Sequence, residues 1–74
     1  MRVYLELIEI LPEDSAEEAD FIRIDITEWN QSDIDNAITL LREHAKIYNS
    51  YILQLHYCYH DENKHCSVTV IEQI

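Results

Sequence analysis

The chain has 74 residues, 47% of them hydrophobic, and a formal net charge of −10 at pH 7. A chain of this length buries roughly 60% of its unfolded surface, and we expect residues 1–74 to form a single α+β domain. The negative charge disfavours direct binding of nucleic acid and of anionic membranes, whose phosphates would repel the chain. Glycine is absent, which excludes the glycine-rich loops that bind phosphates and dinucleotides.

The chain has no apolar run that approaches the ~20 residues of a membrane-spanning helix. Residues 1–11 lack the charged start and small-residue cleavage site of a signal peptide, so we predict a strand there and a cytoplasmic protein. In that compartment both cysteines would be reduced thiols.

Two segments in the first half of the chain have the period-two alternation of half-buried strands. Residues 2–11 place Val3 and two leucines on one face, and Pro12 ends the segment because proline cannot donate to a sheet ladder. Residues 20–27 place three isoleucines on one face. The two segments are close enough along the chain to pair as a hairpin with a long, acidic loop.

Residues 32–49 carry the clearest helical pattern, with Ser32 as the expected N-cap and Asn49 as the expected left-handed terminator. Apolar residues recur there at spacings of three and four, which predicts one buried stripe. The stripe consists of Ile34, Ala37, Ile38, Leu41, Ala45 and Tyr48.

The C-terminal third predicts a second hairpin, with Asn63 as the residue of positive φ in its turn. We favour the register that sets Tyr57 opposite Val68, because the apolar faces of the two strands then coincide. The alternative register sets Tyr57 opposite Thr69, and the apolar face of one strand then meets the polar face of the other. The favoured register turns Cys66 into the core and Cys58 outward, so we expect no disulfide between them.

The expected element order is strand, strand, helix, strand, strand. A helix between two hairpins must cross one face of the sheet to bury its stripe. We therefore predict an α+β two-layer sandwich, ββαββ, in which a four-stranded antiparallel sheet of order 2-1-3-4 carries the helix on one face.

The end of the second hairpin suggests a metal site. The favoured register places the side chains of Cys58, His60 and His65 near one another on the outward face, where they could hold Zn²⁺. The alternative is an ordinary group of surface histidines. No nucleophile lies in a pattern with an oxyanion hole or a cleft, so we expect no enzymatic activity and no bound cofactor.

The sheet face away from the helix is more apolar than a solvated face normally is, which suggests a homodimer interface or a docking surface. The alternative is that its apolar residues are scattered enough to stay hydrated. The expected dimer-face residues are Tyr4, Ile8, Phe21, Ile52 and Ile71.

The charge is concentrated at the N-terminal end: residues 1–35 hold eleven acids and two arginines, a net of −9. Such a surface attracts a basic protein partner and speeds their encounter. The alternative is that the charge only keeps the protein soluble. The predicted partner-binding residues are Glu13, Asp14, Glu17, Glu18, Asp20, Glu28, Asp33 and Asp35.

These observations lead to two functional hypotheses. The first is a small acidic interaction module, such as an inhibitor that mimics nucleic acid on a basic surface of its partner. The second is a homodimeric protein that binds a metal or small ligand at the histidine-rich end of the second hairpin.

Overall fold

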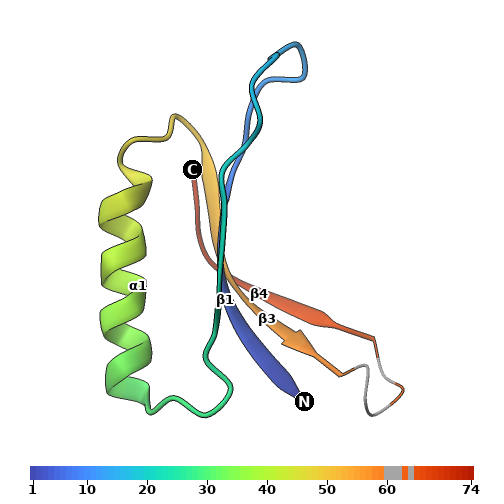
Figure 1. Cartoon of the computed structure of the whole chain (residues 1–74), viewed down its shortest axis with the longest axis vertical. Coiled ribbons are helices and arrows are strands. Elements are labelled where there is room, and N and C mark those ends of the chain that lie inside the picture. The colour runs from blue at the N-terminus through green and yellow to red at the C-terminus, as the bar shows by residue number, and fades with distance from the viewer. Residues whose placement is uncertain (60–62, 64) are drawn as a thin grey trace.

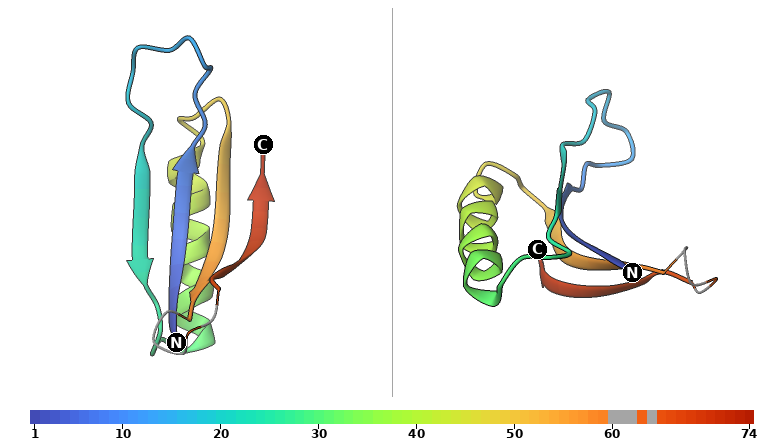
Figure 2. Two further views of the ribbon diagram at one scale, coloured as in Figure 1. Left: turned by 90° about the vertical axis from the view of Figure 1, so that its right-hand side faces the viewer. Right: turned by 60° about the horizontal axis from the view of Figure 1, so that its bottom comes forward.

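The computed structural model describes residues 1–59, 63 and 65–74. The described residues form four strands and one helix, in the order β1 (Arg2–Glu9), β2 (Phe21–Asp25), α1 (Gln31–Ala45), β3 (Tyr51–Cys58) and β4 (Ser67–Gln73). The strands make one antiparallel sheet of order β2-β1-β3-β4, and α1 lies on one face of it (Figures 1 and 2). The predicted ββαββ fold and strand order are confirmed.

The core lies between α1 and the two central strands. Leu5 and Leu7 of β1 are fully buried and pair with Leu55 and Leu53 of β3. The helix packs over these two strands, and its predicted apolar stripe faces them. The alternation of apolar residues in the sequence therefore identified the covered face of the sheet correctly.

Helix α1 begins and ends earlier than the sequence predicted. The N-cap is Asn30 and not Ser32: its Oδ1 accepts a hydrogen bond from the backbone N–H of Asp33, at 2.9 Å. Asparagine caps helices as well as serine does, so residue type alone could not decide whether Asn30 or Ser32 is the N-cap. At the other end, Lys46 and Ile47 donate to carbonyls three residues back, which tightens the last turn.

The described residues include no helix with both the length and the apolar character needed to cross a membrane.

The predicted register of the second hairpin is wrong. Tyr57 pairs with Ser67, not with Val68 or Thr69. The register shifts between Leu53 and Gln54, because β4 holds an extra residue that forms a β-bulge. The predicted positive φ at Asn63 is confirmed, with a value of 55°. The other turn residues of that prediction, 60–62 and 64, lie outside the described residues.

The shift reverses the faces of β4. Val68 and Val70, expected in the core, point away from the helix and are 49% and 50% exposed. Ile71, expected on the open face, packs instead against the core. The physical reason is that α1 does not reach this end of β4, where residues 67–70 are all exposed. Because neither face of β4 is buried at that end, pairing apolar residues with apolar residues stabilises one register little more than another there.

Candidate functional site

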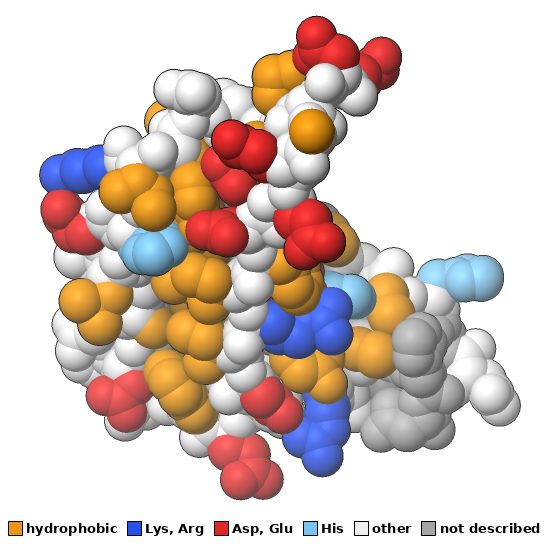
Figure 3. Space-filling view, turned by 45° about the horizontal axis from the view of Figure 1, so that its top comes forward, with side chains coloured by type: hydrophobic (Ala, Val, Ile, Leu, Met, Phe, Trp, Pro, Cys, Tyr) orange, Lys and Arg blue, Asp and Glu red, His pale blue; other side chains and the backbone are white. Residues whose placement is uncertain are grey.

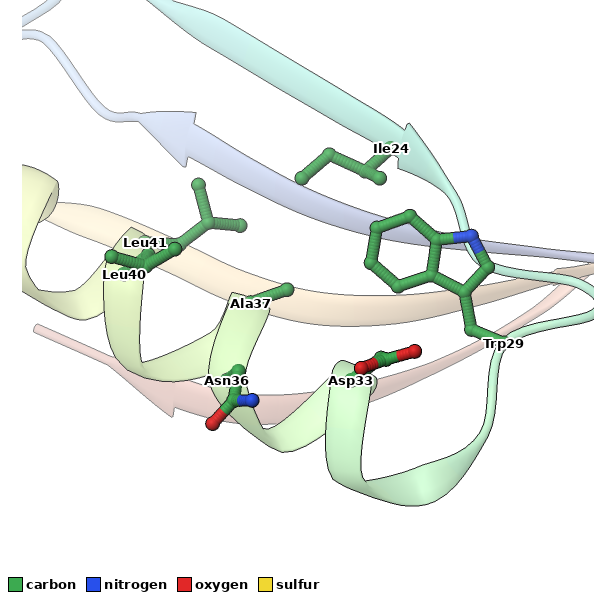
Figure 4. A pocket seen from close by; sticks show the side chains of 7 residues that line it. All are labelled: Ile24, Trp29, Asp33, Asn36, Ala37, Leu40 and Leu41. Carbon is green, nitrogen blue, oxygen red and sulfur yellow. The ribbon is translucent and has the colours of Figure 1, made fainter.

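An apolar groove lies between α1 and the edge strand β2 (Figure 4). Its volume is about 520 Å³, within the range of ligand and peptide-anchor pockets. Asp33 supplies a carboxylate to a lining that is otherwise mostly apolar. The lining residues are Ile24, Trp29, Asp33, Asn36, Ala37, Leu40 and Leu41.

The groove exists because α1 lies over the two central strands and not over β2. Trp29, from the segment that joins β2 to α1, lies at one end of the gap (Figure 4). The side chain of Leu40 borders the gap on the helix and is 70% exposed, while Trp29 is 43% exposed. Two large apolar side chains are thus held at a concave surface without being covered, which is typical of a binding site.

The eight acids predicted to bind a partner fall into two groups. The first group lies in the β1–β2 loop, which extends beyond the end of the sheet (Figure 1). Its members are Glu13, Asp14, Glu17, Glu18 and Asp20. The second group lies at the opposite end of the molecule, where the chain enters α1. Its members are Glu28, Asp33 and Asp35, and all eight are exposed.

The two groups flank the apolar surface beside α1. In the space-filling view an apolar strip runs along this side of the molecule, and acidic side chains gather at both of its ends (Figure 3). In the second group Asp33 also lines the groove. Sequence reasoning thus identified the acids but not the apolar surface between them.

Asp20 is fixed at the base of the β1–β2 loop. Its carboxylate accepts a hydrogen bond from the Tyr48 hydroxyl at 3.0 Å, and its backbone N–H donates to the Glu9 carboxylate at 3.1 Å. Burial and the hydrogen bond to Asp20 raise the pKa of Tyr48 to about 12. The phenol stays protonated at neutral pH and joins the loop to the segment that follows α1.

The open face of the sheet contains a buried carboxylate. Glu6 is only 2% exposed although it points away from the helix. Its carboxylate accepts hydrogen bonds from Arg23 Nε at 2.8 Å and Gln54 Nε2 at 2.7 Å, and its Oε2 lies 3.2 Å from His56 Nδ1. The Arg23 guanidinium in turn lies 4.8 Å from the centre of the Tyr4 ring. Polar partners on both neighbouring strands therefore bury this charge.

Burial alone would raise the pKa of Glu6, since it disfavours the charged form. Hydrogen bonds from Gln54, Arg23 and His56, together with the positive charge of Arg23, outweigh that effect and lower the pKa. Glu6 is therefore an ionised structural group at neutral pH and not a proton donor.

The predicted dimer face is present in part. Tyr4, Ile8, Phe21 and Ile52 lie on the open face, but Ile71 does not. Arg23 lies over the rings of Tyr4 and Phe21, at 4.8 and 5.3 Å from their centres, and so covers part of this face with charge. The homodimer stays a prediction.

The predicted zinc ligands are only partly described. Cys58 is half-buried at the end of β3 and His65 is exposed, while His60 lies outside the described residues. The described residues contain no group of three or more side chains that could hold a metal ion. The zinc site stays a prediction.

Sequence reasoning missed Trp29 and Leu40, and it placed Glu6 on the outward face of the sheet without predicting the polar partners that bury it. A usable signal existed for the first two: Leu40 lies off the helical stripe, and the only tryptophan of the chain stands just before the helix. No family model, curated protein or solved structure matches the chain. Its function is therefore inferred from the groove and the charge.

Proposed function

We propose that the protein is a small non-enzymatic interaction module that acts in the cytoplasm and binds a basic, amphipathic segment of a partner protein. The observation that carries this proposal is an apolar groove with acidic groups at both ends, on a chain of net charge −10. Apolar side chains of the partner would contact Trp29 and Leu40. Lysine and arginine side chains flanking them would meet the acidic groups.

The charge supports a basic occupant over a neutral one. Groups of like charge at both ends of the groove favour a ligand of opposite sign and speed its approach. Asp33 lies in the groove itself, so a partner segment with an anionic residue at that position would be repelled. Apolar contact in the groove would supply most of the affinity, because exposed ion pairs contribute only about 0–1 kcal/mol each.

Trp29 provides a direct assay, because it is the only tryptophan and lines the groove. The probe is a synthetic helical peptide with leucines on one face and lysines on the other. We expect its binding to shift the Trp29 emission to shorter wavelength, with affinity falling at least tenfold between about 0.05 and 0.5 M salt. A peptide with the same lysines but serines for leucines is the control and should give no shift. Equal responses to both peptides, or none to either, would contradict the proposal.

Two variants separate the groove from the charge. Leu40→Ser keeps every charge and should abolish the shift. Neutralisation of Glu13, Asp14, Glu17 and Glu18 to their amides keeps the groove and should weaken binding about tenfold at low salt but little at high salt. Unchanged binding in the neutralised variant would show that the acids of the β1–β2 loop do not contact the peptide, and only the groove would remain as its binding site.

A finer proposal is that the partner segment belongs to a nucleic-acid-binding surface, so that the acidic groups take the place of phosphates. Short duplex DNA should then release the leucine–lysine peptide from this protein by binding the peptide, without itself binding this protein. Direct binding of labelled DNA to the protein would contradict this part.

A further inference from the structure

The corrected hairpin register brings the two cysteines together. Tyr57 and Ser67 are the last pair of the β3–β4 ladder, and extending the same register by one residue places Cys58 opposite Cys66, which directly precedes β4. Both side chains are half-buried thiols. Burial and a hydrogen bond with the Cys58 thiol raise the pKa of the Cys66 thiol, and a hydrogen bond from the Tyr59 backbone partly offsets this, so the two thiols are neighbours. The expectation that these cysteines lie on opposite faces is therefore wrong.

Positions directly opposite in an antiparallel pair suit a disulfide. Their Cβ atoms lie about 4.5–5.5 Å apart, and a disulfide requires about 3.5–4.5 Å. Closing the bond thus needs an approach of about 1 Å, and a disulfide formed in this way stores strain. A bond closed under such tension is also readily reduced again.

We propose that Cys58 and Cys66 form a reversible disulfide by exchange with a small disulfide such as oxidised glutathione. The thiolate of one cysteine attacks a sulfur of the small disulfide and expels one thiolate, which leaves a mixed disulfide. The second cysteine loses its proton to solvent, attacks the protein sulfur of that mixed disulfide and expels the other thiolate. Two protein thiols are thereby oxidised, and one small disulfide is reduced to two thiols.

The bond would join the edge strand β4 to β3 beside the turn that connects them. It would also remove Cys58 as a thiolate ligand, so the oxidised protein could not use that residue to bind zinc. This inference does not depend on the groove or on a partner protein. Oxidation and peptide binding can thus be tested separately in the same preparation.

The sequence offers a clean assay, because Lys64 lies between the two cysteines. The full chain is equilibrated in mixtures of reduced and oxidised glutathione, quenched with acid, alkylated and digested with trypsin. We expect an intact monomer that has lost both thiols without gaining glutathione. Its tryptic peptides containing Cys58 and Cys66 should stay linked until a reductant is added.

The matched controls are Cys58→Ser and Cys66→Ser, each of which should gain one glutathione and give no linked peptides. Three results for the unaltered chain would overturn the proposal: stable glutathione adducts, a dimer linked between chains, or two unreacted thiols in fully oxidised glutathione. A rise in the melting temperature of the oxidised monomer by roughly 5–10 °C, absent in both variants, would support the bond as a staple between β3 and β4.

Discussion

The two faces of β1 are buried in different ways. Leu5 and Leu7 point toward α1 and are fully buried among apolar side chains. Glu6, between them, points to the open face and is almost equally buried, under Arg23, Gln54 and His56. One face is covered by a helix, and the other is covered locally by a network of polar side chains.

This difference shows that burial and apolar character are separate properties of a sheet position. On the helix side, burial adds to stability with each apolar atom removed from water. On the open side, a buried carboxylate is tolerated only while its partners satisfy it, and its net contribution is smaller. Substitutions on alternate residues of one strand can therefore test the two modes of burial directly.

The largest effect is expected on the helix side. Leu7→Ala should lower the free energy of unfolding by about 3–4 kcal/mol, because it leaves a cavity beneath α1. Urea unfolding followed by circular dichroism measures this. Leu40→Ala on the exposed side of the helix is the control and should change the stability by less than about 0.5 kcal/mol. A similar loss in both variants would mean that α1 does not cover β1 as described.

A smaller effect is expected at Glu6. Glu6→Ala should cost about 2–3 kcal/mol, because it leaves the donors of Gln54 and His56 without their acceptor. The cost is limited because Arg23 is 46% exposed and can be hydrated. Glu6→Gln keeps the shape and should cost less than Glu6→Ala. If Glu6→Ala were as mild as a surface change, the open face would not depend on this network.

The smallest effect is the pH dependence that Glu6 confers. Its lowered pKa means that the folded state holds its proton less tightly than the unfolded state does. The stabilisation is therefore complete above the ordinary carboxyl value of 4.5 and is lost as the pH falls through the lower folded value. Urea midpoints measured from about pH 7 to pH 3 should fall less steeply in Glu6→Gln than in the unaltered chain.

Asp25→Asn is the control for this titration. The pKa of Asp25 is also lowered, by hydrogen bonds from Thr27 and by Arg2, but this carboxylate is exposed to solvent. Solvent and salt weaken such pairs, so the acid slope should change less in this variant than in Glu6→Gln. An equal change of the acid slope in the two variants would show that the burial of Glu6 does not increase its contribution to the pH dependence of stability.

The sequence by itself determined the strands, the helix, their order and the strand order of the sheet. Alternation with period two and the helical stripe are local properties, and a short chain with two hairpins around one helix has few ways to pair its strands. The inward residues of β1 and β2 followed from the same patterns and are confirmed by the cluster around Leu5, Leu7 and Ile24.

Only the tertiary structure decided the cysteine pair, the groove and the burial of Glu6. The bulge in β4 set the register that brings Cys58 to Cys66, and no local pattern encodes an extra residue in a strand. The lateral position of α1 over β1 and β3 opened the groove beside Trp29, since the helical stripe specifies which face is buried but not which strands it covers. Glu6 was buried by partners that lie 17 and 48 residues away along the chain. In each case the deciding contact is between segments distant in sequence, and residue patterns within one segment do not determine it.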